Sequence, residues 1–268
     1  MSKRKRLREI EELEELEALQ EREQEIVDPI QALLDSFFAD GLITEVLHVV
    51  KSGKEATVYC CRAHPSLGIP YVAAKVYRSR QNRGFKNDSI YQEGRFVSDQ
   101  RIKRAMKNKS STGREAQFSM WIAHEYMMLT MLYQAGATIP RPITHNSHAI
   151  LMEYVGEPQQ PAPALQYVQL APDEVYPIFA RIMDNIELWL QHNVVHGDLS
   201  PYNILYWNGQ VTIIDFPQAV DPRFNAHAYN LLAHDIGTIC TYVSRYGLQR
   251  DADAIARRLW HQFKNARL

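Results

Sequence analysis

The chain has 268 residues, 46% of them hydrophobic, and a formal net charge of −1 at pH 7. This length suits one or two domain cores. Because the net charge is close to zero, the molecule as a whole is not attracted to polyanions, and any such attraction must come from local basic patches. The three cysteines have neither metal-site spacing nor an even number, which excludes a disulfide framework and favours a reducing compartment. No run approaches the roughly 18 apolar residues of a membrane span, and no apolar signal segment follows the basic residues 3–8. We therefore expect a cytoplasmic protein without membrane contact.

The first predicted element is a glutamate-rich helix over residues 9–27, which we interpret as part of a charged N-terminal helical segment over residues 1–28. A second helix should begin at Asp28-Pro29, because Asp caps helices and Pro suits their first position, and should end at Gly41. Its apolar face would pack on the strands that follow. This face consists of Ile30, Leu33, Leu34, Phe37 and Phe38.

Residues 47–60 predict two strands joined by a polar turn, at the position where a loop covering phosphates would lie. The turn contains the single Gly53 and matches neither G-x-G-x-x-G nor a Walker loop, so by itself it fits any hairpin. We nevertheless expect the turn to border a nucleotide, with Lys54 acting as a point charge toward phosphate oxygens. The expected contacts are Ser52, Gly53, Lys54 and Glu55.

Residues 71–77 predict a strand whose Lys75 corresponds to the lysine of V-A-I-K, which reaches the α- and β-phosphates of a nucleotide. An edge lysine with a solvated tip is the alternative. Six apolar neighbours favour a buried strand instead, in which an ammonium needs an anionic partner. We predict that partner to be Glu125, since apolar residues at helical spacing surround it, although a helical glutamate can equally be solvated. These apolar residues are Trp121, Met128, Leu129 and Leu132.

A basic insertion is predicted between this strand and the Glu125 helix, at residues 78–114. It holds eleven Lys or Arg against three Asp or Glu, an excess of eight positive charges. Loops of this length within a compact domain are usually functional or disordered. A solvated mobile loop is one interpretation, and a contact with an anionic partner, most simply structured RNA, is the other.

Residues 141–155 predict a hairpin around Asn146-Ser147 that runs into a hinge between two lobes. Met152 would then lie at the back of an adenine pocket, with the Glu153 carbonyl and the Val155 amide bonding the base. A proline-rich extended connector over residues 157–172 and a helix over residues 173–192 should follow.

The most informative motif is His196-Gly197-Asp198-Leu199-Ser200-Pro201-Tyr202-Asn203, followed after an apolar strand by Asp215. In kinases with an H-R-D-x-x-x-x-N loop, the Asp orients the attacking hydroxyl, the Asn holds a magnesium ion, and a second Asp binds the metals that bridge the phosphates. Asp198, Asn203 and Asp215 fit these three roles. Asp and Asn also serve ordinary turns, but the complete string with a downstream strand is far rarer than an isolated pair.

Only 53 residues follow Asp215, and they contain no A-P-E string. The H-R-D arginine that pairs with an activation-loop phosphate is also missing. We expect the two apolar patterns near the C-terminus to form the core of a reduced large lobe. They are Leu231, Ile236, Ile239 and Tyr242, and then Ile255, Leu259 and Phe263. The predicted fold is therefore α+β, a protein-kinase-like two-lobed fold with an N-lobe over residues 29–155 and a reduced C-lobe over residues 156–268.

Four motifs occur in one order between about residues 45 and 245: Ser52-Gly53-Lys54-Glu55-Ala56, Ala74-Lys75-Val76-Tyr77, His196-Gly197-Asp198-Leu199-Ser200-x-Tyr202-Asn203-Ile204-Leu205 and Ile214-Asp215-Phe216-Pro217-Gln218. Together they resemble the RIO family of atypical kinases. No winged-helix domain precedes the first strand and no basic C-terminal tail follows, so a bacterial-type member fits best.

The resemblance implies ATP and Mg²⁺ as cofactors, with Mn²⁺ able to replace Mg²⁺. It implies that Asp198 is the catalytic Asp, that Asn203 and Asp215 are metal ligands, and that Lys75 is the phosphate-binding lysine. In this family the residue matching Asp215 can itself accept the phosphoryl group, so an ATPase cycle is expected beside serine phosphorylation. The expected partner is a protein substrate or a ribosome-related particle, and the sequence does not indicate an oligomeric state.

Two other functional classes remain open. A small-molecule kinase resembling aminoglycoside or choline phosphotransferases also uses an H-G-D-x-x-x-x-N string, but the S-G-K-E-A turn and the D-F-P-Q string favour the RIO type. A nucleotide-binding scaffold without turnover disagrees with the intact set of Lys75, Asp198, Asn203 and Asp215.

Overall fold

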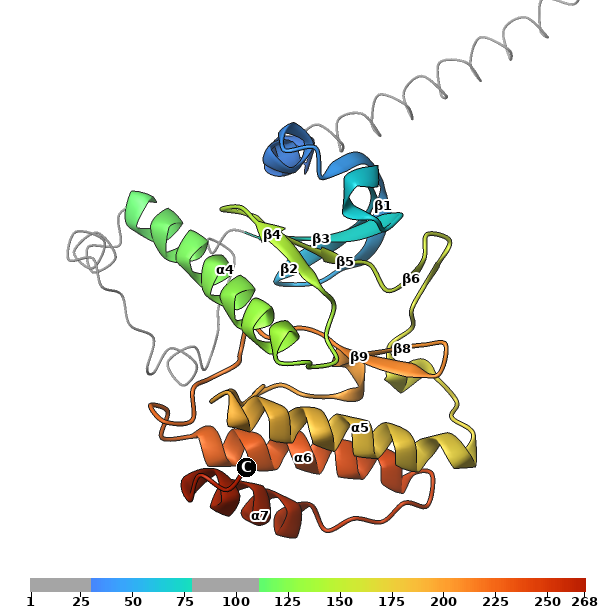
Figure 1. Ribbon diagram of the computed structural model, residues 1–268, viewed down its shortest axis with the longest axis vertical. Coiled ribbons are helices and arrows are strands. Elements are labelled where there is room, and N and C mark those ends of the chain that lie inside the picture. Colours follow the sequence, from blue (N-terminus) through green and yellow to red (C-terminus); the bar gives the residue numbers. More distant parts are fainter. Residues whose placement is uncertain (1–29, 79–110) are drawn as a thin grey trace, which may run out of the picture.

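The computed structural model describes residues 30–78 and 111–268, and these form two lobes (Figure 1). The predicted N-terminal segment over residues 1–28 and most of the basic insertion lie outside the described residues. Among the described residues, none of the helices combines the length and the apolarity that a membrane span requires.

The N-terminal lobe is built on an antiparallel five-stranded sheet of order β1-β2-β3-β5-β4. Its strands are β1 (Ile43–Ser52), β2 (Ala56–Ala63), β3 (Tyr71–Tyr77), β4 (Pro142–His145) and β5 (Ala149–Glu153). A helix over residues 30–39 covers one face, where it buries Leu34 and Phe37 against Val72, Ala74 and Val76. Because strand side chains alternate between faces, Lys75 and Tyr77 point to the opposite face.

Helix α4 (Ser111–Gln134) lies beside that opposite face (Figure 1). The helix buries one stripe of residues spaced by four and three, which is the spacing of a single helix face. The stripe contains Phe118, Ile122, Glu125, Leu129 and Leu132. Glu125 therefore occupies a core position of this helix. Since α4 begins at Ser111, the last four residues of the predicted insertion are helical.

The connector between the lobes is more structured than the extended segment predicted for it. It contains the two short strands β6 (Gly156–Glu157) and β7 (Gln160–Pro161) and a 3-10 turn, η3 (Leu165–Tyr167). Gly156 has φ +114°, and a side chain at this position would come within 2.5 Å of the Ala162 nitrogen. The turn from the sheet into the connector therefore requires glycine here.

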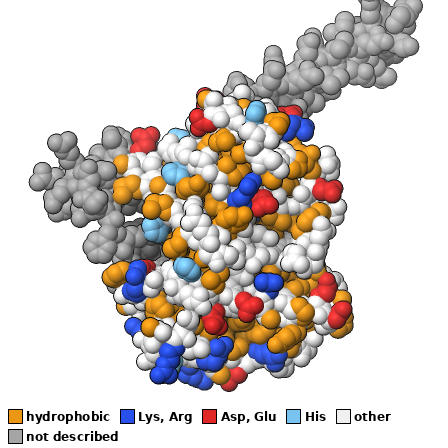
Figure 2. Space-filling model, in the orientation of Figure 1, with side chains coloured by type: hydrophobic (Ala, Val, Ile, Leu, Met, Phe, Trp, Pro, Cys, Tyr) orange, Lys and Arg blue, Asp and Glu red, His pale blue; other side chains and the backbone are white. Residues whose placement is uncertain are grey.

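The C-terminal lobe consists of α5 (Pro172–Gln191), α6 (Ala228–Ser244) and α7 (Ala252–Lys264), with the hairpin of β8 (Ile204–Trp207) and β9 (Gln210–Ile213) on the side facing the sheet (Figure 1). Its core contains Ile182, Trp189, Ile236, Ile239 and Leu259. Lys and Arg side chains gather at the end of the molecule that α7 forms (Figure 2). The two-lobed α+β architecture with a small helical lobe confirms the predicted fold class.

Candidate active site

Lys75 joins the two lobes electrostatically. Its Nζ donates hydrogen bonds to Oε1 of Glu125 (2.9 Å) and to Oδ1 of Asp215 (2.7 Å). The side chains of Lys75 and Glu125 are 12% and 3% exposed, whereas that of Asp215 is 39% exposed. The predicted pair between Lys75 and Glu125 is therefore present, and Asp215 is a second partner that the motif spacing alone did not indicate.

Charge compensation decides the ionisation of this cluster. Burial opposes the charge on Lys75, but the carboxylates of Asp215 and Glu125 outweigh it and hold the pKa of the ammonium well above its usual range. Burial would raise the pKa of Asp215, but Lys75 overcomes this effect and lowers it. His196 and Lys51 make smaller contributions that also lower the pKa of Asp215. The Lys75 cation and the Asp215 anion therefore persist at neutral pH.

Asp198 and Asn203 are held together by the loop between α5 and β8. Nδ2 of Asn203 donates to the backbone carbonyl of Asp198 (2.9 Å) and lies 3.4 Å from its Oδ2. Asn203 is buried at the end of the 3-10 turn η4 (Pro201–Asn203), while Asp198 is exposed. Although the residue is exposed, surrounding protein groups partly desolvate its carboxylate, and this desolvation together with the negative charge of Asp215 raises the pKa of Asp198, which makes the carboxylate a better proton acceptor.

Asp215 directs its carboxylate into this site through an unusual backbone. It follows β9 and has φ +74°, a left-handed conformation that is uncommon for residues other than glycine. The preceding Ile214 donates its N–H to the carbonyl of Asn203 (2.9 Å). The strand end that carries Asp215 is thus fixed directly to the turn that carries Asn203.

His196 supports the loop as a neutral side chain. Burial lowers the pKa of His196 to about 4, so the ring carries one proton at neutral pH. Its Nδ1 accepts from the Asp198 N–H (3.3 Å), which leaves Nε2 to donate to the carbonyl of Ile214 (3.2 Å). The ring also packs against Phe216 and Trp189, with ring centroids 4.5 Å and 5.7 Å away. His196 therefore links the Asp198 loop to the Asp215 strand.

Asp235 is a site residue that the sequence patterns did not indicate. It lies on α6, it is 2% exposed, and it accepts from the N–H groups of Gly197 (2.8 Å) and Leu199 (2.9 Å), one with each carboxyl oxygen. Burial raises its pKa to about 7. These two bonds enclose Asp198 and fix the backbone on both sides of it. The available signal was an acidic residue within the apolar stripe of a helix, since a carboxylate there requires partners.

The turn between β1 and β2 lies next to the end of β3, because Ala56 pairs with Tyr77 and the Arg78 N–H donates to the Glu55 carbonyl (2.9 Å). The Gly53 N–H donates to the Ala56 carbonyl (2.9 Å), and Lys54 is exposed. Arg78, at the end of β3, donates to the Ser52 hydroxyl (2.7 Å). The predicted contacts of Ser52, Gly53, Lys54 and Glu55 with a nucleotide remain predictions.

The predicted adenine-binding segment begins with the last two residues of β5, Met152 and Glu153. Met152 is partly buried, between the cores of the two lobes. The Glu153 N–H donates to the carbonyl of Arg141 (2.8 Å), and the Val155 carbonyl accepts from Ala162 (3.1 Å). Within the described part of the chain, no backbone group accepts from the Val155 N–H. Base recognition by Glu153 and Val155 stays a prediction.

Replacing Asp235 by Asn tests whether its two bonds to the backbone on either side of Asp198 matter. The single amide oxygen can accept from one of the two N–H groups, and the other is left unsatisfied, which costs about 1–3 kcal/mol of stability. We expect kcat to fall by about tenfold to hundredfold, because small misplacements of catalytic groups have effects of this size. Steady-state kinetics and urea unfolding measure the two quantities.

The matched control is Asp253→Asn, which removes an exposed carboxylate from the first turn of α7. It should leave kcat within about twofold of the wild type. An Asp235→Asn variant that is equally active would show that the loop holds its conformation without this anchor.

The chain is similar to known proteins over most of its length. Residues 45–255 match the RIO domain. The Thermoplasma acidophilum RIO-type serine/threonine-protein kinase Rio1 is 30% identical over 188 residues, which cover 70% of this chain and 92% of that protein. Human serine/threonine-protein kinase RIO1 is 28% identical over 227 residues, covering 84% of this chain and 38% of the relative. The chain thus spans well under half of that eukaryotic protein.

The crystal structure of the Rio2 kinase-ADP/Mg²⁺-phosphoaspartate complex from Chaetomium thermophilum has a TM-score of 0.62 to this chain at 18% identity. The match covers 84% of this chain and 64% of that one. At this identity the likeness establishes the fold.

Proposed function

The chain belongs to the RIO family, and from this membership we propose that it is an ATP- and Mg²⁺-dependent phosphotransferase of the RIO type, acting as a serine kinase or as an ATPase switch. The observation that carries the proposal is the convergence of Lys75, Asp198, Asn203 and Asp215 in one site. The small-molecule kinase alternative is less favoured, because the family match covers both lobes.

The donor set fits a nucleotide-bound Mg²⁺. Hard oxygen ligands suit this ion, which proteins usually bind through one or two carboxylates together with substrate phosphates. No group of three His, Cys, Asp or Glu within the described residues could hold a metal. Asp215 and the side-chain oxygen of Asn203 would therefore hold the ion jointly with the phosphates. When bound, Mg²⁺ neutralises the charge that develops on the transferred group.

The residues present support two acceptors for the γ-phosphoryl group. In the first, Asp198 accepts the proton of a serine hydroxyl while the oxygen forms the new P–O bond and ADP leaves. In the second, an Asp215 carboxylate oxygen forms the bond, ADP leaves, and water later releases phosphate from the acyl phosphate. Asp215 supports this second role because it is partly exposed and its pKa is lowered, so that it is an anion at neutral pH. Lys75 would orient the phosphates in both.

The acceptor is identified by the chemistry of the label. After incubation with radioactive ATP, an acyl phosphate on Asp215 should be released by neutral hydroxylamine and by base, whereas a phosphoserine ester resists mild hydroxylamine. We expect a hydroxylamine-sensitive fraction in the wild type. The measurement is the radioactivity that the protein retains on filters before and after treatment with hydroxylamine.

The control is mass spectrometry after borohydride trapping, which locates the acyl phosphate directly. An Asp215→Asn variant would lose the label and a metal ligand together, so that trapping at Asp215 is the stronger evidence. A label that survives hydroxylamine completely would restrict the protein to serine autophosphorylation.

For the partner, we propose a protein or ribosome-related particle whose RNA contacts the basic residues 78–114. The excess of eight positive charges in this segment supports it. RNA binding should weaken steeply with salt, because phosphate contacts release counterions, and should fall when Arg101, Lys103, Arg104 and Lys107 become Glu. Filter binding across a salt series measures both, and an affinity independent of salt would contradict the proposal.

For the location, we propose the cytoplasm, in line with three free, buried cysteines. Recovery of the protein in an extracytoplasmic fraction would contradict it.

A further inference from the structure

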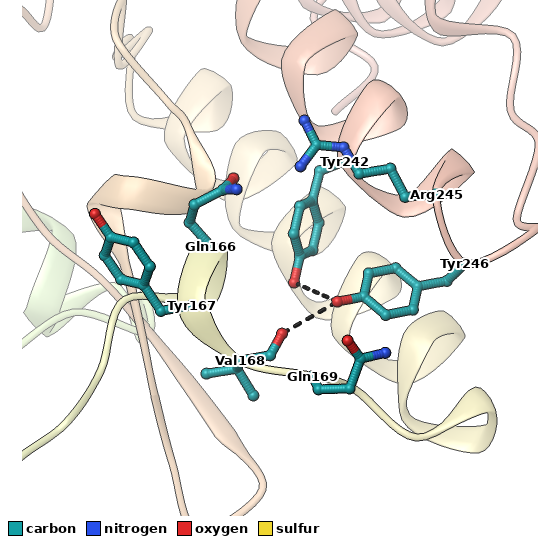
Figure 3. A pocket seen from close by; sticks show the side chains of 7 residues that line it. All are labelled: Gln166, Tyr167, Val168, Gln169, Tyr242, Arg245 and Tyr246. Carbon is teal, nitrogen blue, oxygen red and sulfur yellow. Dashed lines mark hydrogen bonds between the residues drawn. The ribbon is translucent and has the colours of Figure 1, made fainter.

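A cavity lies between the connector and the C-terminal end of α6 (Figure 3). Its volume is about 350 Å³. The connector lines it with Gln166, Tyr167, Val168 and Gln169, and the end of α6 and the turn after it line it with Tyr242, Arg245 and Tyr246. The lining thus offers two side-chain amides, three phenols and one guanidinium.

The wall of this cavity is preorganised by hydrogen bonds. The Tyr242 hydroxyl donates to the Leu165 carbonyl (2.9 Å), and the Tyr246 hydroxyl donates to the Val168 carbonyl (3.1 Å). The two hydroxyl oxygens are 3.4 Å apart (Figure 3). Because both protons are directed at the connector, α6 and the connector are locked together, and the cavity needs no rearrangement to form.

Arg245 gives the cavity its charge. The residue is exposed, and its backbone N–H donates to the Tyr242 carbonyl (3.2 Å), whereas its guanidinium makes no hydrogen bond or ion pair with any residue that the structure describes. The other lining side chains are neutral. A guanidinium offers several N–H donors in a planar fork that matches a carboxylate, and the amides of Gln166 and Gln169 can add donors beside it. One free cation among neutral donors fits a single carboxylate better than a nucleic-acid backbone, which is bound by several basic side chains.

Tyr167 connects the cavity to the catalytic loop. Its ring points away from the other lining side chains (Figure 3) and forms an edge-to-face pair with Tyr202, with ring centroids 5.7 Å apart. The two side chains are 75% and 48% exposed. Tyr202 precedes Asn203 and lies four residues after Asp198. Exposed tyrosines of this kind supply rigid, amphipathic contact area in protein interfaces.

We propose that this surface, formed by Arg245, Gln166, Gln169, Tyr167 and Tyr202, binds the protein substrate: Arg245 takes an acidic side chain, and the tyrosine pair takes the segment between that side chain and the serine at Asp198. This inference rests on the proposed kinase function and adds a substrate preference to it. The connector and the turn after α6, in place of a longer segment after Asp215, would hold the peptide.

The test uses serine peptides that differ only in one residue, Glu or Gln, placed in turn at each position from five before to five after the serine. Binding to the full chain with a non-hydrolysable ATP analogue is measured by fluorescence anisotropy. We expect the wild type to bind Glu peptides about fivefold more tightly than Gln peptides at one or two positions, since an exposed pair contributes modestly. Arg245→Ala should remove the difference between Glu and Gln, and Tyr167→Ala should weaken both peptides.

The matched control is Arg258→Ala, which removes an exposed guanidinium from α7 and should leave the Glu preference intact. Autophosphorylation with ATP is measured separately in the wild type and should be unchanged in the control Arg258→Ala. A wild type that autophosphorylates but binds Glu and Gln peptides equally at every position would overturn the inference alone. A preference for Glu peptides without any ATP turnover would support the peptide-binding role of this surface and overturn the proposed function. RNA binding that is lost in Arg245→Ala but not in Arg258→Ala would assign the cavity to nucleic acid and overturn the inference.

Discussion

An Asp198→Ala variant is expected to transfer phosphoryl groups to a hydroxyl acceptor about 10²–10⁴-fold more slowly than the wild type, which is the usual contribution of a positioned proton acceptor. Nucleotide affinity should change little. The reason is that Asn203 is held by the backbone carbonyl of Asp198 (2.9 Å), which the substitution retains, and that the Asp235 bonds go to the neighbouring N–H groups. Single-turnover assays measure the transfer rate, and calorimetry measures the dissociation constant for MgATP.

The same variant separates the two proposed acceptors. A carboxylate has no proton to lose when it attacks phosphorus, so the hydroxylamine-sensitive label on Asp215 should still form in Asp198→Ala while serine phosphorylation is lost. Asp173→Ala, which removes an exposed carboxylate at the start of α5, is the control for charge. Wild-type transfer to serine by Asp198→Ala would contradict the role given to this residue.

The sequence indicated Lys75, Asp198, Asn203 and Asp215 as candidate site residues because phosphoryl transfer requires these residue types at characteristic spacings, and such spacings can be read from a sequence pattern. The structure brings the four together, and their roles stay predictions. Glu125 could be predicted from the sequence for a different reason. It lies in the apolar stripe of a helix, and Lys75, a lysine with six apolar neighbours in its strand, required an anion. The structure places both partners within hydrogen-bond distance.

The roles of residues that depend on contacts distant in sequence could not be predicted in this way. Asp235 meets the catalytic loop across 38 and 36 residues, and no local motif announces that contact. Arg78 was counted with the basic insertion, whereas its guanidinium turns back to Ser52 across 26 residues. The connector was predicted to be extended from its prolines, but pairing of β6 with β7 and packing on β8 gave it structure that proline content does not reveal.

The Lys75→Met variant is expected to be impaired in stability as well as in nucleotide binding. Removing the ammonium leaves Glu125 buried, with its Oε2 already lacking a hydrogen-bond partner among the described residues, and leaves Asp215 without its closest cation. Breaking a buried pair in this way costs about 3–5 kcal/mol. The partial exposure of Asp215 places the expected loss of unfolding free energy at the lower end, about 3 kcal/mol. Urea unfolding at constant m-value measures it.

Adding Glu125→Gln to this variant separates the structural part of the effect from the functional part. A neutral amide removes the uncompensated charge, so the double variant should regain about 1–2 kcal/mol of the lost stability. It should not regain MgATP affinity, because the cation that would contact the phosphates is still absent. Lys54→Met, which removes an exposed lysine from the turn between β1 and β2, controls for the loss of one positive charge and should leave stability within about 0.5 kcal/mol of the wild type.

If the double variant is instead less stable than Lys75→Met, then Glu125 is stabilised by groups other than Lys75, and the ion pair does not hold α4 against the sheet. If stability and affinity recover together, Lys75 acts on the nucleotide only through the position of α4.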